Sequence, residues 1–192
     1  MSDEISKFGD SVDASIVRNA GQADLVGLEG VYIAECRDAQ GNLKWSDSIE
    51  NLTTNVGRAS MLDAYFGNVG GGALVMGLKG TGTAAYADTQ ASHATWLEVG
   101  SVNAPAYSGT RKTPTFSTAT VANPAVKSTS AAVVFAMTSS GTVAGAFINV
   151  GGSSVIDNTT GTLLSAGDFT AGSKTVTSGD TISVTYTLSA AG

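Results

Sequence analysis

The residues with the widest chemical range lie together between positions 88 and 112 of the 192-residue chain. This stretch holds the only histidine, His93, one of the two tryptophans, Trp96, and the adjacent cations Arg111 and Lys112. An imidazole can act as a base or a metal ligand, an indole ring can stack on a ligand, and cations can bind an acidic partner. These residue types make positions 88–112 the first candidate for a functional site.

A catalytic or metal-binding role for His93 needs partners that the sequence does not supply. Asp88 and Glu98 lie near it in the chain, but there is no second histidine and no HExxH motif. The single cysteine, Cys36, lies in a strand-like run far from these residues. Zinc sites and catalytic bases draw on larger sets of such groups. We expect His93 to be a structural, hydrogen-bonded residue, Cys36 to be a small buried hydrophobe, and no metal or other cofactor to be bound.

The other side chains of this stretch point to recognition. Arg111 and Lys112 are expected on a solvated face, with contact to an acidic neighbour as the alternative. Trp96 and Tyr107 could stack on a sugar ring, although such aromatic residues more often pack within the protein. A connection as long as residues 80–109 is commonly functional or has short structure of its own. We therefore expect this loop to contact another subunit through His93, Trp96, Tyr107, Arg111 and Lys112.

Motifs for phosphate binding and for glycoside hydrolysis are incomplete. The glycine-rich residues 70–72 and 77–83 lack the GxxxxGK[ST] spacing of a phosphate-binding loop, so turns around a strand at 73–78 are expected. A glycoside hydrolase needs two carboxylates facing each other across a cleft. Residues 102–192 hold three carboxylates, each beside a Gly or Asn that is typical of a turn: Asp157, Asp168 and Asp180. The sequence therefore predicts that the protein is not an enzyme.

Charge is distributed unevenly along the chain. Residues 1–30 carry a net charge of −4, residues 31–101 carry −3 and residues 102–192 carry +1, within a formal total of −6. An acidic chain without a stripe of Lys and Arg is repelled by phosphate backbones, so nucleic-acid binding is not expected. No signal-like start and no apolar run of about 18 residues occurs, so we expect no membrane association and synthesis in the cytoplasm.

The second half of the chain is rich in neutral hydroxyl side chains. Ser and Thr contribute 30 of the 91 residues from 102 to 192. A surface of this kind can pack beside a neighbour with little desolvation of full charges. The composition therefore favours a protein that packs beside copies of itself or another subunit.

The clearest helix signals surround residues 55–66. Thr53-Thr54-Asn55 offers hydroxyl and amide groups that can cap a helix N-terminus, and apolar residues follow at helical spacing. Gly67 stands where such a helix would end. We expect one helix here, with its apolar face against the edge or the end of a sheet.

Most of the remaining chain shows strand patterns. Residues 31–37 and 43–46 flank a Gly-containing loop of hairpin length. Residues 131–137 are apolar on both faces, which predicts a central strand. In residues 181–188 Ile182, Val184, Tyr186 and Leu188 alternate with hydroxyl side chains, the pattern of a half-buried antiparallel strand. Together with residues 174–177 this strand predicts a final hairpin.

Strands about ten residues apart with Gly/Ser turns predict a mainly β fold. We expect an antiparallel β-sandwich of jelly-roll or Ig-like type, with one short helix near 55–66 and an N-terminal arm. The arm comprises residues 1–28 and a single sandwich domain comprises residues 29–192. The arm carries an apolar stripe at helical spacing that Gly9 interrupts and that is too thin for a core. Its members are expected to anchor the arm to a partner: Ile5, Phe8, Val12 and Ile16.

Several stretches resemble a family of virion structural proteins from tailed bacteriophages, over roughly residues 30–190. They are Met76-Gly77-Leu78, Asp88-Thr89-Gln90-Ala91-Ser92-His93-Ala94-Thr95-Trp96, Tyr107-Ser108-Gly109-Thr110-Arg111-Lys112, Gly161-Thr162-Leu163-Leu164-Ser165-Ala166-Gly167 and Ser178-Gly179-Asp180-Thr181. The resemblance implies membership of the virion. It does not distinguish the head from the tail, and it does not extend to the arm.

Two functions are compatible with this resemblance. The first is a capsid decoration or cement protein on the capsid surface, which bridges subunits of the major capsid protein and forms symmetric homo-oligomers, with a trimer favoured. The alternative is a host-attachment component, a head fibre or tail fibre protein that binds a surface glycan. Copy number separates the two, because cement proteins cover the shell and fibres are few.

Overall fold

The structure is a computed structural model that describes residues 27–65 and 72–191. Its elements, in chain order, are β1 (Gly27–Arg37), β2 (Leu43–Thr53), α1 (Asn55–Tyr65), β3 (Leu74–Lys79), β4 (Glu98–Val99), β5 (Ala125–Ser128), β6 (Val133–Ala136), β7 (Gly141–Val143), β8 (Gly145–Val150), β9 (Thr162–Asp168), β10 (Lys174–Val176) and β11 (Thr181–Ala191). The predicted arm anchors Ile5, Phe8, Val12 and Ile16 lie outside the described residues.

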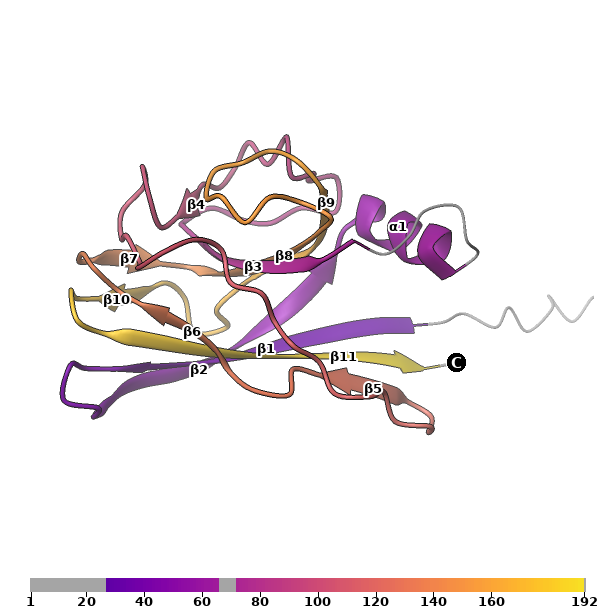
Figure 1. The fold of residues 1–192 in the computed structure, drawn as a ribbon, viewed down its shortest axis with the longest axis horizontal. Coiled ribbons are helices and arrows are strands. Elements are labelled where there is room, and N and C mark those ends of the chain that lie inside the picture. The colour runs from indigo at the N-terminus through magenta and orange to yellow at the C-terminus, as the bar shows by residue number, and fades with distance from the viewer. Residues whose placement is uncertain (1–26, 66–71, 192) are drawn as a thin grey trace, which may run out of the picture.

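The strands form two layers that one long strand connects (Figure 1). In the first layer, β11 lies between β1 on one side and β5 and β6 on the other, and β2 pairs with the second edge of β1. In the second layer the order is β4-β3-β8-β9, and every pairing is antiparallel. β2 joins the layers because its last residues, Leu52 and Thr53, pair with Ala166 and Ser165 of β9. The predicted antiparallel β-sandwich is confirmed, whereas its jelly-roll or Ig-like type stays a prediction.

The main core lies between the two layers. Alternate residues in the middle of β1 and β11 point inward and are buried, as strand geometry requires for a sheet with one covered face: Gly30, Tyr32, Ala34, Cys36, Ile182, Val184 and Tyr186. The rings of Tyr32 and Tyr186 meet there with their centroids 4.5 Å apart. Cys36 is buried in this core as predicted, and Leu188 faces inward as predicted and packs against the core while partly buried. Each fully buried apolar side chain contributes about 1.5–3 kcal/mol before conformational entropy is counted.

The single described helix begins where the sequence predicts. Thr54 caps it: its hydroxyl accepts a hydrogen bond from the Gly57 N–H at 3.0 Å and donates one to the Leu163 carbonyl at 2.5 Å. The helix packs against β9 so closely that a Cβ at Gly57 would lie 2.3 Å from the Leu164 carbonyl oxygen. Gly57 is therefore required for the contact, and α1 covers the end of the second layer as expected.

Two strand predictions are wrong. Residues 131–137 do not form a central strand: among the described strands β6 pairs only with β11, and Val134 and Ala136 are exposed. The predicted final hairpin does not form either, because β10 pairs with β7. Both edges of β11 are already occupied, one by β1 and the other by β5 and β6, so no edge is left for β10.

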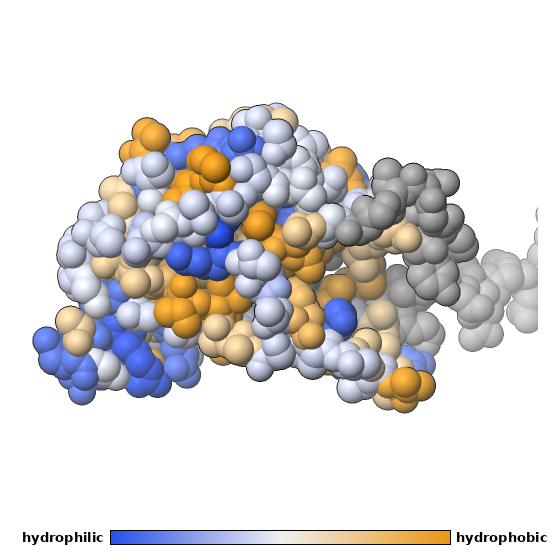
Figure 2. Space-filling model, in the orientation of Figure 1, coloured by the Kyte–Doolittle hydropathy of each residue, from blue (hydrophilic) through white to orange (hydrophobic). Residues whose placement is uncertain are grey.

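The layers separate slightly at the end near α1. Apolar residues come to the surface between the layers in Figure 2. A cleft of about 70 Å³ there is lined by side chains of both layers, among them Leu74, Phe116 and Leu188. Phe116 belongs to a stretch with a single isolated bridge, to Thr129.

Candidate functional site

Residues 80–112 and 151–161 form loops over the outer face of the second layer (Figure 1). They bury a second, smaller apolar cluster that consists of Trp96, Phe147, Leu163 and Ala166. Alternate residues of β8 point to opposite faces of the sheet, so Ile148 enters the main core and Phe147 lies under the loop. The strand is consequently buried on both faces, and the loop acts as a third layer.

Trp96 is the centre of this cluster. Only 1% of its surface is exposed, and its indole N–H donates a hydrogen bond to Oδ2 of Asp88 at 2.8 Å. The same Asp88 oxygen accepts the backbone N–H of Ala85, also at 2.8 Å. The His93 ring stacks on the indole with centroids 3.9 Å apart, and its Nδ1 is 2.9 Å from the Trp96 carbonyl oxygen. His93 is half-buried and hydrogen-bonded, and it holds the indole in place.

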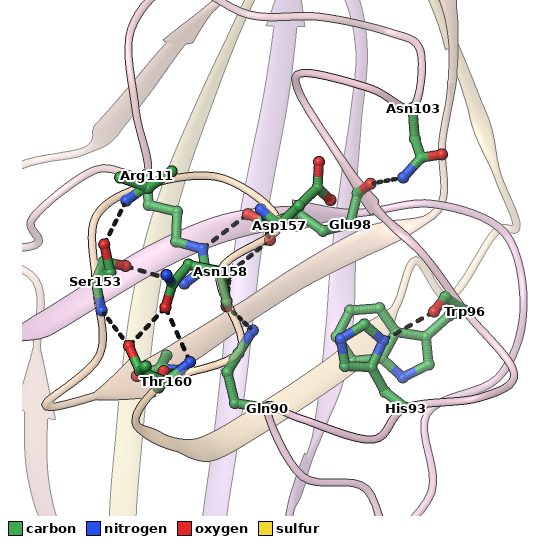
Figure 3. Close-up of polar contacts among 12 residues, drawn as sticks. Gln90, His93, Trp96, Glu98, Asn103, Arg111, Ser153, Asp157, Asn158 and Thr160 are labelled. Atoms are coloured by element: carbon green, nitrogen blue, oxygen red, sulfur yellow. Dashed lines mark hydrogen bonds and ion pairs between the residues drawn. The ribbon is translucent and has the colours of Figure 1, made fainter.

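Glu98 and Arg111 form a bidentate ion pair beneath the loops (Figure 3). Arg111 Nε lies 2.8 Å from Glu98 Oε1, and Arg111 Nη2 lies 2.6 Å from Glu98 Oε2. Both side chains are buried, and the guanidinium lies over the Phe147 ring at 5.5 Å. The planar guanidinium matches a carboxylate in this arrangement, which is the strong form of the interaction.

The same ion pair also holds the loop at residues 151–161 in place through hydrogen bonds. Arg111 donates to the carbonyl oxygens of Ser153 at 2.9 Å and Asn158 at 2.8 Å, and Glu98 accepts the backbone N–H of Asp157 at 2.8 Å. Asp157 has a φ of 62°, a left-handed conformation that Asp tolerates better than most residues. Both oxygens of Glu98 and every nitrogen of the Arg111 guanidinium therefore have partners, as a buried charge pair requires.

Lys79 is a second buried cation. Its ammonium lies 2.5 Å from Oδ1 of Asp168, donates to the carbonyl oxygens of Gly80 and Gly82, and lies over the Trp96 ring at 5.6 Å. Burial lowers the pKa of Lys79, and the Asp168 carboxylate opposes that shift. Sequence reasoning treated Lys79 as part of a glycine-rich turn and Asp168 as a turn residue, so it missed this pair.

A glycine makes the contact between Lys79 and Asp168 possible. Gly145 of β8 pairs with Lys79 on one side and with Asp168 on the other. A Cβ at this position would lie 1.9 Å from the Gly167 carbonyl oxygen. Because Gly145 has no side chain, the Lys79 side chain reaches Asp168 past the intervening strand. The small residues around position 145 are the signal from which this approach could have been inferred.

Tyr107 and Lys112 hold the C-terminal end of the loop at residues 80–112 against the protein. Tyr107 is 3% exposed and meets the Phe135 ring edge to face at 5.0 Å. Burial raises the pKa of Tyr107 well above its usual value, and the charge of Glu98 adds to the shift. The Lys112 ammonium donates to the Ser108 carbonyl at 2.6 Å and lies over the Tyr107 ring, and its backbone pairs with Met76.

The structure corrects the role predicted for three of the five loop residues. Trp96, Tyr107 and Arg111 are buried inside the chain, so they are not surface contacts, and the expected solvated face does not include Arg111. Neither aromatic ring is open to a stacking sugar. His93 and Lys112 remain partly exposed. Trp96 covers Phe147 on the outer face of the second layer, Arg111 lies over the Phe147 ring, and Tyr107 packs into the main core against Phe135.

The three acidic residues of the second half also contribute to the fold, two of them through their carboxylates and Asp157 through its backbone. Asp168 pairs with Lys79, and Asp157 contributes its N–H to Glu98. Asp180 is 2% exposed, lies 2.5 Å from the Lys44 ammonium and accepts the Thr177 N–H at 2.7 Å. Burial raises the Asp180 pKa, but these hydrogen bonds outweigh burial and lower it overall.

A hollow of about 360 Å³ lies beside the His93 ring, between the two loops. The polar groups of Glu98, Asn158 and His93 Nδ1 that border it already bond within the protein. Gln90 donates to the Asn158 carbonyl at 3.3 Å, while its buried Oε1 has no hydrogen-bond partner in the described part of the chain. Across residues 27–65 and 72–191, no group of three or more His, Cys, Asp or Glu side chains could hold a metal ion.

The candidate site thus consists of ion pairs, hydrogen bonds and ring contacts that hold two loops against the second layer. In the described part of the chain, no helix is long and apolar enough to cross a membrane. Comparison of the chain with protein-family models, with curated proteins and with solved structures finds no match.

Proposed function

We propose that this chain is a structural protein of a tailed-phage virion, which decorates the capsid and stabilises it by bridging capsid subunits. The proposal starts from the resemblance of residues 30–190 to virion structural proteins. Its structural support is that the side chains of the loop at residues 80–112 make contacts within the chain. A decoration protein has to keep one shape while it is bound to the shell, and contacts within the chain hold this loop in one position.

The observation that carries the proposal is the buried pair of Glu98 and Arg111. The two side chains hold three separate segments together: β4, the end of the long loop, and residues 153–158. Partners that are rigid before binding lose less conformational entropy when they associate. The charged groups of the site, Glu98 and Arg111, are instead fully engaged by contacts within the chain, which favours a structural over a catalytic role.

The proposed partners are the major capsid protein and further copies of this chain, in a symmetric homo-oligomer with a trimer favoured. Binding to the folded shell and not to its separated subunits stabilises the shell by mass action. An arm and a flat sandwich can each bury surface across a subunit boundary, and stable interfaces bury about 1,200–2,000 Å² in total. The location that follows is the capsid surface, after assembly in the host cytoplasm.

The arm provides a direct test. Virions carrying Phe8→Ala together with Ile16→Ala are expected to lose occupancy of this protein and resistance to heat, because both substitutions remove apolar anchors. Ser11→Ala, also in the arm, is the matched control and leaves occupancy unchanged. Full occupancy and heat resistance of the double variant would remove the arm from the proposal.

Copy number tests the proposal against attachment to a host glycan. Densitometry of virion proteins is expected to show the chain in hundreds of copies per particle, since a shell-stabilising protein repeats with the lattice. A count of a few to a few tens would favour a fibre. The two aromatic rings first considered as sugar platforms, Trp96 and Tyr107, are buried, so nothing in the candidate site favours the fibre.

A further inference from the structure

The outer face of the first layer is open and apolar at its centre. β1 lies between β2 and β11, so its outward side chains sit in the middle of the sheet. Val31 and Ile33 are nevertheless 40% and 44% exposed, and Val134 of β6, on the same face, is 49% exposed. Val31 and Ile33 adjoin each other, while Val134 stands opposite Ser183 of β11, one strand away from β1. Exposed apolar side chains at the centre of a sheet can mark an interaction surface.

Hydroxyl side chains surround this centre. Thr185 and Thr187 of β11 stand directly opposite Ile33 and Val31, and Ser48 of β2 stands opposite Ile33 on the other side. Such neutral groups can be covered without desolvating a full charge, provided that the partner or interfacial water supplies hydrogen bonds. The face therefore has the composition of an interface with an apolar core and a polar surround.

The charges on the face are acidic and lie to one side. Glu50 of β2 stands opposite Val31, and Glu29 lies two residues before Val31 on β1. Glu35 is neutralised by Arg37 at 3.1 Å, but Glu29 and Glu50 have no ion-pair partner among residues 27–65 and 72–191. A partner that covers this face has to place positive charge at the margin occupied by Glu29 and Glu50.

The negative charge of Glu29 and Glu50 disfavours three possible partners: a second copy of the chain, its own N-terminal part and a nucleic acid. A second copy docked by its own identical face, in the orientation that sets the two acidic margins against each other, would bring acids toward acids, which is unfavourable. Residues 1–26, which precede β1, carry five acids and two bases, a net charge of −3, and would be repelled in the same way. A nucleic acid is a polyanion and is excluded for the same reason.

We propose that the outer face of the first layer, centred on Val31 and Ile33, docks onto another protein whose surface is apolar in the middle and basic along one margin. This inference rests on the proposed function for the assembly concerned, in which that protein is a subunit of the shell. In this arrangement the first layer of the sandwich contacts the shell, and the loops at residues 80–112 and 151–161 lie on the side away from it.

The test uses phage particles that lack this protein and the purified full-length chain added back to them. Ile33→Gln removes the apolar centre without adding charge, and Val155→Gln is the control, because Val155 is 56% exposed on the opposite, loop-covered side. Ile33→Gln is expected to bind about tenfold more weakly than the wild type. Val155→Gln is expected to bind as the wild type, and both variants keep the wild-type melting temperature.

Charge is tested separately with Glu50→Lys. Its binding is expected to be about three- to tenfold weaker than that of the wild type at low salt, with the difference lost near 1 M salt, where screening acts over about 3 Å. Tighter binding by Glu50→Lys would show an acidic partner and overturn the inference. A wild-type homodimer in sedimentation that Ile33→Gln dissociates would identify a second copy as the occupant, and would also overturn it.

Failure of this inference is distinguishable from failure of the proposed function. If the wild type binds the particles and Ile33→Gln binds equally well, the face is wrong and the decoration role stands. If the wild type itself does not bind the particles, the proposed function falls.

Discussion

Nη2 of Arg111 lies 2.6 Å from Oε2 of Glu98, in a position where the two side chains are 0% and 2% exposed. The pair lies over Phe147 and under the loops, where few groups other than each other can compensate their charges. It fixes the relative positions of the long loop and of residues 153–158. The stability of the loops therefore depends on two residues that are 13 positions apart in the chain.

Removing one member of this pair should be strongly destabilising. Arg111→Met leaves the Glu98 carboxylate buried without its counter-ion, and we expect a loss of about 3–5 kcal/mol in the free energy of unfolding. Urea denaturation of the purified protein measures it. The double variant Glu98→Gln/Arg111→Met should recover part of the loss, because no uncompensated charge remains. A double variant less stable than Arg111→Met alone would contradict this account.

Gly145 should not tolerate even one additional methyl group. A Cβ would lie 1.9 Å from the backbone oxygen of Gly167, and backbone cannot rotate away as a side chain can. Gly145→Ala is expected to lower the free energy of unfolding by at least about 2 kcal/mol, from strain of the kind that overpacking produces. Gly41→Ala is not a suitable control because Gly41 has a positive φ, so Ala94→Gly on an exposed loop serves instead. Equal stability of Gly145→Ala and the wild type would disprove the close approach.

Fluorescence can report on the hydrogen bond between Asp88 and Trp96. In a Trp45→Phe background Trp96 is the only tryptophan, and with selective excitation of tryptophan its burial predicts a blue-shifted spectrum that acrylamide quenches poorly. Asp88→Ala removes the acceptor of the indole N–H and leaves that buried donor unpaired, at an expected loss of about 1–3 kcal/mol. The emission of Trp96 should then shift to the red. An unchanged spectrum and an unchanged melting temperature would argue against the contact.

Acid should weaken the protein through Asp47. Burial raises the pKa of this carboxyl, but hydrogen bonds from Lys174, from Thr170 and from backbone N–H groups lower it to about 2, compared with 3.8 for the free group. A pKa depressed by folding stabilises the protein above the unfolded value. That contribution, at most about 2 kcal/mol and reduced by solvent screening, is lost as the pH falls from about 4 toward 2.

Melting temperatures across this pH range test the role of Asp47. The wild type should lose more stability between pH 4 and pH 2 than Asp47→Asn does, since the variant has no carboxyl to protonate at this position. The ion pair between Lys174 and Asp47, 2.7 Å long, is one of the contacts that this protonation would weaken. Parallel curves for the two proteins would show that Asp47 is not the responsible group.

Patterns confined to neighbouring residues could be predicted from the sequence. The alternation in residues 181–188 correctly marked a strand with one buried face, and the capping hydroxyl of Thr54 correctly marked the start of the helix. Cys36 was correctly placed in the core. In each case the deciding contacts lie within a few residues or follow from the period of the strand, so local sequence contains the necessary information.

Partners distant in the chain could be decided only by the tertiary structure. Arg111 and Lys112 are adjacent cations of similar appearance, yet only Arg111 reaches a buried carboxylate, because only its side chain enters the space between Glu98 and residues 153–158. Lys79 and Asp168 are 89 positions apart and meet past a glycine on the strand between them. Whether a charge is solvated or buried depends on where its counter-ion lies, and whether a strand pairs with the next one depends on which edges are free. Neither is encoded in the local pattern.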